Sequence, residues 1–137
     1  MFRNPPDDDL RQLLRAVKTI AVVGFSNRTQ RPSHGVARAM QQAGYRIIPV
    51  RPDIGEGLGE RAYATVADLP EAPDLVDVFR APQYVADIVD DCIARGVKAL
   101  WLQEGVVDEA AAERARAAGI TVVMDRCILK DYHALMS

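Results

Sequence analysis

The segment from Gly24 to Val36 carries side chains and backbone suited to hold a phosphate group. It follows an apolar run, Thr19–Gly24, that is typical of a buried strand, and it leads into a stretch with helical spacing. Ser33 is expected to cap that helix, whose free N–H groups and dipole favour an anion. The other polar side chains of the segment that could contact a phosphate are Ser26, Arg28 and Arg31. We therefore predict a phosphate-binding turn; the alternative is an ordinary strand-to-helix loop with a serine cap.

The same segment does not fit an NAD-binding domain. Of the fingerprint G-x-G-x-x-G only Gly24 is in place, and the loop is longer. NAD sites also use an acidic residue after the second strand, where this chain has Arg51. Arg51 suits a phosphate on a ribose, as in NADP or the 3′-phosphate of coenzyme A, or else is a solvated loop arginine. Residues 55–59, with three glycines, are predicted to form a mobile surface loop.

Further polar residues follow the third and fourth predicted strands. Arg80 is a candidate for contact with a ligand phosphate, and Gln103 for a hydrogen bond to a pantetheine amide, although neighbouring loop backbone could satisfy either side chain. Ligands of doubly wound sheets bind beyond the carboxyl ends of the strands, where the strand order reverses. These residues are therefore expected to lie on the same rim as the phosphate-binding turn.

The sequence shows no catalytic set. His34 and His133 are far apart, and no Ser-His-Asp combination is apparent. Cys92 and Cys127 form neither a disulfide framework nor a metal motif. Cys92 falls on the apolar face of a predicted helix, whereas Cys127 follows the fifth strand on the ligand side and is a candidate for reaction. Three acidic residues are interpreted as caps or strand-end residues, not metal ligands: Asp68, Asp74 and Asp77.

Length and composition favour one domain over residues 1–137, since 137 residues that are 49% hydrophobic can form one core. The net charge of −2 and the absence of a basic run argue against binding to nucleic acid. No apolar run approaches the roughly 18 residues of a membrane span, and the N-terminus lacks the apolar region of a signal peptide. We therefore expect a cytoplasmic protein with reduced thiols and no membrane partner.

Strands and helices alternate along the chain. Helical spacing begins near Asp7, Ser33, Pro82 and Asp108, and the tail from residue 125 holds at most one helical turn. The strands are predicted at residues 19–24, 45–50, 75–79, 97–102 and 120–124. This pattern predicts an α/β fold, a single Rossmann-type, doubly wound, five-stranded parallel sheet of order 3-2-1-4-5. The flavodoxin-like order 2-1-3-4-5 is the alternative.

Several separated motifs resemble the stand-alone CoA-binding domain proteins, the YccU-like family. They occur in the family's order between about Leu10 and Cys127: Val22-Val23-Gly24-Phe25-Ser26, Arg31-Pro32-Ser33, Gly35-Val36-Ala37-Arg38, Gly44-Tyr45, Ile48-Pro49-Val50, Asp77-Val78-Phe79-Arg80, Trp101-Leu102-Gln103-Glu104-Gly105-Val106 and Met124-Asp125-Arg126-Cys127. The chain is also similar to the N-terminal CoA-binding domain of the succinyl-CoA synthetase α subunit, whose loop after its first strand is likewise Gly-Phe-Ser/Thr.

The resemblance implies that coenzyme A binds along the strand ends. It assigns the phosphates to Gly24, Phe25, Ser26, Arg31 and Ser33. It places the adenine beside Val50 and Pro52, the nucleotide under Phe79 and Arg80, and the pantetheine near Gln103 and Glu104. Family members often carry Asn before the proline that follows strand two, and this chain has Arg51 there.

The synthetases hold their phosphorylated histidine in further domains, for which this chain has no room. We therefore predict non-catalytic binding of coenzyme A, or of a short acyl-CoA, by a carrier, sensor or regulator. Two alternatives stay open. One is an NADP-dependent enzyme, which Arg51 would suit, and the other is an accessory subunit of an acyl-CoA synthetase.

Overall fold

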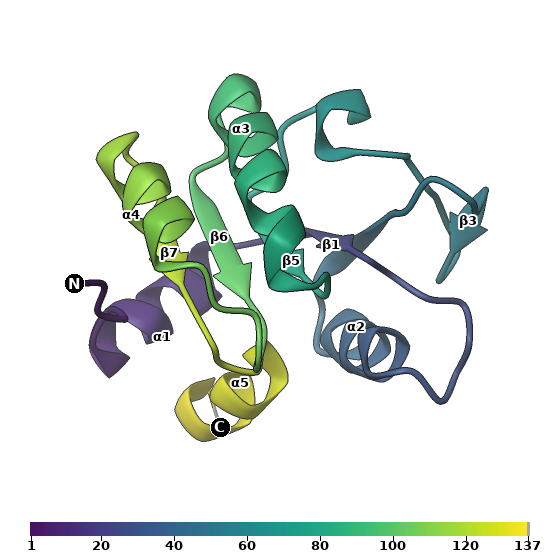
Figure 1. Cartoon of the computed structure of the whole chain (residues 1–137). Coiled ribbons are helices and arrows are strands. Elements are labelled where there is room, and N and C mark those ends of the chain that lie inside the picture. The colour runs from purple at the N-terminus through teal and green to yellow at the C-terminus, as the bar shows by residue number, and fades with distance from the viewer. Residues whose placement is uncertain (137) are drawn as a thin grey trace.

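The computed structural model describes residues 1–136, which form a parallel sheet with helices on both faces (Figure 1). The strands of this sheet are β1 (Thr19–Val23), β2 (Arg46–Val50), β5 (Leu75–Val78), β6 (Ala99–Leu102) and β7 (Thr121–Val123). The helices are α1 (Asp7–Ala16), α2 (Pro32–Gln42), α3 (Val85–Arg95), α4 (Glu109–Ala117) and α5 (Ile128–Met136). Two single 3₁₀ turns, η1 (Val66–Asp68) and η2 (Pro82–Tyr84), and a small hairpin, β3 (Glu56–Gly57) with β4 (Glu60–Arg61), complete the described elements.

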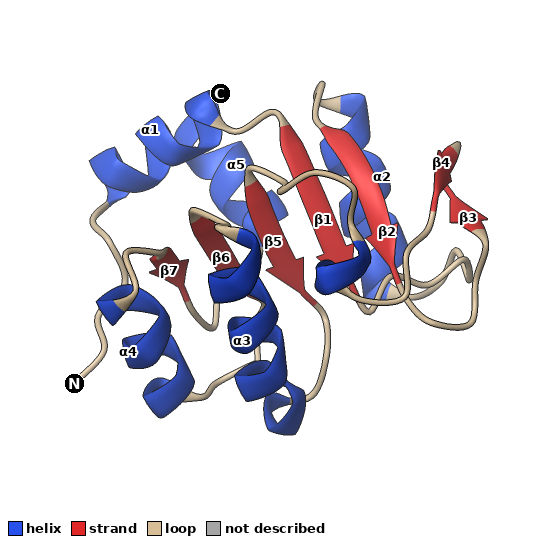
Figure 2. Cartoon of the chain, turned by 90° about the horizontal axis from the view of Figure 1, so that it is seen from above, coloured by secondary structure: helices blue, strands red, loops and turns tan. Residues whose placement is uncertain are grey.

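The helices form two layers around the sheet (Figure 2). α3 and α4 lie on one face, and α1, α2 and α5 lie on the other. Successive strand residues point to opposite faces, so Ala21 packs under α3 and α4 whereas Val22 packs under the other layer. Strands β5 and β6 are buried at every position, which explains their apolar sequences, with Asp77 of β5 as the exception.

The strand order is β2-β1-β5-β6-β7, which is 2-1-3-4-5 when the five long strands are counted along the chain. The α/β class and the five-stranded parallel sheet are confirmed. The predicted order 3-2-1-4-5 is wrong, and the flavodoxin-like alternative is correct. β5 needs neighbours on both sides because it is buried along its whole length, whereas β2 has an exposed Arg46 and suits the outer position.

A set of hydrogen bonds fixes β5 beside β1. The Asp74 carboxylate accepts the backbone N–H groups of Lys18 and Thr19 at 2.8 and 3.1 Å. In return, the Thr19 hydroxyl accepts the N–H of Asp74 at 2.9 Å. These bonds tie the first residues of the two strands together, so the chain leaving β2 must cross to the far side of β1.

The glycine-rich segment at residues 55–59 was expected to be a mobile surface loop, and it instead belongs to the β3–β4 hairpin beside β2. Gly57 is buried, and a Cβ atom at this position would lie 2.4 Å from Cε2 of Phe25. The Phe25 side chain is itself fully buried. The hairpin therefore packs directly against the loop that follows β1.

The C-terminal tail is more ordered than its sequence indicates. The expected single turn is the nine-residue helix α5, which packs against α1 and α2. Tyr132 meets the ring of Tyr45 edge-on with 5.9 Å between centroids, and Arg11 Nε donates to the Leu135 carbonyl at 3.0 Å. No helix within residues 1–136 combines the length and the apolar composition needed to cross a membrane.

The contact between Gly57 and Phe25 predicts a position-specific effect of adding one methyl group. Gly57→Ala should lower the free energy of unfolding by about 1–3 kcal/mol, because the fully buried Phe25 ring has little room to move. Gly55→Ala is the matched control, since a Cβ there meets no atom within 4 Å. Urea unfolding measures both, and equal stability of the two variants would contradict the packing described.

Candidate functional site

The strand order reverses between β1 and β5, and the loop after β1 leaves the sheet at this point. Gly24 is the first residue of that loop and has φ +85°. A Cβ atom on Gly24 would lie 2.7 Å from the carbonyl oxygen of Phe79, the residue after β5. Both the backbone angle and the close approach require glycine here. The ends of the two strands can therefore stay in contact beside an open crevice.

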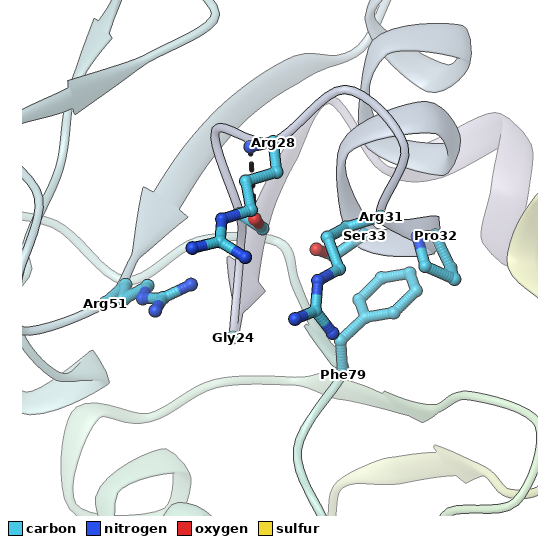
Figure 3. A pocket seen from close by; sticks show the side chains of 8 residues that line it. Gly24, Arg28, Arg31, Pro32, Ser33, Arg51 and Phe79 are labelled. Atoms are coloured by element: carbon cyan, nitrogen blue, oxygen red, sulfur yellow. Dashed lines mark hydrogen bonds between the residues drawn. The ribbon is translucent and has the colours of Figure 1, made fainter.

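A cavity of about 430 Å³ lies over this point (Figure 3). The guanidinium groups of Arg28, Arg31 and Arg51 point toward the same space from three positions around it. The cavity is lined by Gly24, Ser26, Arg28, Arg31, Pro32, Ser33, Arg51 and Phe79. Three permanent positive charges and two hydroxyl groups make it a site for a multiply charged anion.

Local structure explains how the loop presents these groups. The Ser26 hydroxyl accepts the N–H of Arg28 at 3.1 Å, which closes a short turn above Gly24. The expected cap at Ser33 is wrong: α2 begins at Pro32, a common first helical residue, and Arg31 occupies the cap position without a side-chain bond. Ser33 therefore lies inside the first turn, where its hydroxyl lines the cavity beside the positive end of the helix.

Arg51 is oriented by its neighbours. Its Nε and Nη2 atoms donate to the Asp53 carboxylate at 2.6 and 3.2 Å, and Nη1 donates to the Phe25 carbonyl at 3.4 Å. The hydrogen bond from Arg51 holds the pKa of Asp53 below its usual value. Both side chains are substantially exposed, at 38% and 65%, so the pair is weak and its geometry can adapt to an anion.

A second cavity, of about 180 Å³, lies between the ends of β1 and β2 and the start of α3. Its lining includes Val23, Val50, Pro52, Arg80, Tyr84 and Ile88. The Arg80 guanidinium stacks over the Tyr84 ring, 4.0 Å from the centroid, and so forms one flat wall. Apolar side chains and a flat cationic wall suit an aromatic ring system.

The two cavities bring together most of the residues that the sequence indicated. Gly24, Ser26, Arg31, Ser33, Arg51 and Phe79 line the first cavity, and Val50, Pro52 and Arg80 line the second. Three candidates lie outside both linings. Phe25 is fully buried, Gln103 is 5% exposed, and the exposed Glu104 pairs with Lys130 at 3.0 Å.

Asp77 is the residue that the sequence interpretation missed. It is 2% exposed in the middle of β5, and its Oδ1 accepts a hydrogen bond from Gln103 Nε2 at 2.5 Å. Burial raises the pKa of Asp77 to about 7, and the bond from Gln103 offsets only part of that rise. The signal was present in the sequence, because an ionisable residue inside a strand buried on both faces needs a specific partner.

The chain is similar to known proteins over most of its length. Residues 18–133 match the family described as CoA binding domain. The uncharacterized protein YneT of Bacillus subtilis is 39% identical over 134 residues, which are 98% of each chain. A hypothetical protein from Pyrococcus horikoshii has a solved structure with a TM-score of 0.94 and 31% identity, covering 100% of this chain and 99% of that one. The ADP-forming acetate–CoA ligase II of Archaeoglobus fulgidus is 27% identical over 74% of this chain, but that match spans only 15% of the ligase.

The raised pKa of Asp77 predicts a pH-dependent stability. Well below pH 3.8 the carboxyl group is protonated in both states. As pH rises toward about 7, the unfolded chain releases a proton that the folded chain retains, so the free energy of unfolding falls. Asp77→Asn removes this pH-dependent loss of stability. Between about pH 5 and pH 8 the free energy of unfolding of the variant should therefore rise by about 2–3 kcal/mol relative to that of the parent. Parallel urea titrations measure the difference, and a gap independent of pH would contradict the assignment.

Proposed function

Since the chain belongs to the CoA-binding domain family, we propose that it binds coenzyme A or a short acyl-CoA at the carboxyl ends of the strands, without converting it, as a carrier, sensor or regulator. Residues 1–137 would form one such domain. The observation that carries the proposal is the convergence of Arg28, Arg31 and Arg51 on one cavity at the point where the strand order reverses. Coenzyme A brings a diphosphate and a 3′-phosphate, and so matches this concentration of charge.

The two cavities support one orientation of the ligand. The diphosphate would sit over Gly24, beside the hydroxyls of Ser26 and Ser33 in the first cavity. The adenine would enter the second cavity beside Val50 and Pro52. Arg51 follows Val50 directly and also lines the first cavity, so it lies between the two ends of the nucleotide. That position suits the 3′-phosphate on the ribose.

Binding without turnover is supported by the chemistry of the lining. Within the described chain the two cavities are lined by arginine, serine and apolar residues, together with Asp87, Asp91, Thr65 and Tyr84 at the second one. His34, the histidine nearest the loop in sequence, packs against Phe25 with the rings tilted by 43° and 5.9 Å between their centroids. The similarity to a domain-sized part of an acetate–CoA ligase also supports a second candidate, an accessory subunit that supplies bound CoA to such an enzyme.

Arg51 should distinguish coenzyme A from dephospho-coenzyme A. Arg51→Ala is expected to weaken binding of coenzyme A roughly tenfold to a hundredfold, the range for one charge-assisted contact, and to change binding of dephospho-coenzyme A much less. Isothermal titration calorimetry measures both. Arg46→Ala is the matched control, because it removes one positive charge at the opposite end of β2. Arg46 pairs there with Glu60.

Two results would count against these assignments. Equal affinity of the parent protein for the two ligands would remove the role given to Arg51. Absence of heat with either ligand would overturn the proposed function.

Cys127 should form a mixed disulfide with the thiol end of the ligand. It is partly exposed just before α5, on the carboxyl side of β7. On mixing with CoA disulfide, the Cys127 thiolate would attack one ligand sulfur, form the protein–CoA disulfide and release the other coenzyme A as its thiolate. Cys92 is the internal control, since burial raises the pKa of its thiol to about 12. Mass spectrometry of peptides locates the adduct, and an adduct on Cys92 or none at all would refute the expectation.

A further inference from the structure

Gln103 belongs to a row of residues that crosses the carboxyl edge of the sheet. Asp77 of β5 is in register with Val22 of β1 and Trp101 of β6. Two residues further along these three strands come Gly24, Phe79 and Gln103. Phe79 N–H donates to the Val23 carbonyl at 2.8 Å and Gln103 N–H to the Val78 carbonyl at 3.3 Å, so the ladder continues to this edge.

This edge row starts inside the first cavity and ends outside it. Gly24 and Phe79 line the cavity, and Gln103 is the next position in the same direction. Neighbouring strands of a sheet lie about 4.8 Å apart, so Gln103 is within reach of a chain that leaves the cavity across Phe79. A ligand with its diphosphate over Gly24 and a flexible arm would pass Gln103 along this row.

The ionised carboxylate of Asp77 gives the side-chain amide of Gln103 one fixed orientation. When Asp77 is ionised its Oδ1 can only accept, so the group that points to it at 2.5 Å is the Nε2 amine. The carbonyl oxygen Oε1 of the same amide is then directed away from Asp77. Without an acceptor at position 77, the two ends of the amide could exchange places.

We propose that Asp77 is a positioning residue for ligand recognition: by holding Gln103 Nε2 it presents Gln103 Oε1 at the edge row as the acceptor for an amide N–H of the ligand arm. The inference rests on the proposed function, since pantetheine supplies such amide groups. It assigns a use to a carboxyl group that is otherwise costly to bury. Asp77 does not itself contact the ligand.

Calorimetry with two ligands separates positioning from a purely structural role. Coenzyme A carries the amide arm, and adenosine 3′,5′-bisphosphate has the nucleotide end without it. Asp77→Leu removes the acceptor and should weaken coenzyme A about tenfold, the upper range for one hydrogen bond, while the bisphosphate binds within about twofold of the parent. Asp77→Asn keeps an acceptor oxygen but adds an NH2 donor, so it should restore only part of the affinity. Asp77→Ala tests the same loss without added bulk if the leucine variant does not fold.

A double-mutant cycle shows whether Asp77 acts through Gln103. Gln103→Leu should weaken coenzyme A to a similar degree, and adding Asp77→Leu to it should cause no further loss. Three results would each overturn the inference. Asp77→Leu could bind coenzyme A as tightly as the parent does, or it could lose equal affinity for both ligands. In the cycle, the losses of affinity from the two substitutions could be fully additive. Failure of the parent protein to bind either ligand would instead overturn the proposed function, so the two failures are distinguishable.

Discussion

The close approach of Gly24 to the carbonyl of Phe79 is the constraint on which the site depends. Any side chain at position 24 would meet that carbonyl at 2.7 Å, and the backbone there has a positive φ that other residues rarely adopt. The loop after β1 supplies Ser26 and Arg31 to the cavity, and α2 begins at its lining with Pro32. The cavity is therefore a consequence of backbone packing.

The positive charge of this cavity is kept accessible by weak interactions. Arg51 is held by an exposed carboxylate, a kind of ion pair that contributes at most about 1 kcal/mol to stability. A phosphate offers a bidentate partner with more charge, so exchange of Asp53 for a ligand oxygen requires little free energy. Arg28 and Arg31 lie on an exposed loop, whereas Ser33 is buried in the first turn of α2. The site thus combines the buried Ser33 with exposed arginine side chains that can adapt to a ligand.

The sequence predicted the fold class and most of the rim, because glycine, proline and alternating apolar runs act locally. The prediction from the sequence failed where contacts between residues far apart in the chain determine the structure. The order of the strands depends on Asp74 bonding to Thr19, and residues 55 positions apart leave no local pattern. The helix α5 is stabilised by packing on α1 and α2, and the hairpin by the ring of Phe25, which no propensity reveals. Asp77 was read as a strand-end residue because its partner, Gln103, lies 26 positions away.

The pair of Asp77 and Gln103 connects the apolar core to the rim. Asp77 shares its face of the sheet with Val22 and Trp101, so the carboxyl group is surrounded by residues that cannot solvate it. When Asp77 is ionised it can only accept, so its interaction with Gln103 fixes the Nε2 amine toward it; a protonated carboxyl group also has an O–H donor, which can bind Gln103 Oε1 instead. The orientation of the Gln103 amide is therefore fixed above about pH 7, where Asp77 is ionised. A neutral apolar residue would pack at position 77 with less loss of free energy, so the carboxyl group is best explained by what it holds in place at the edge of the sheet.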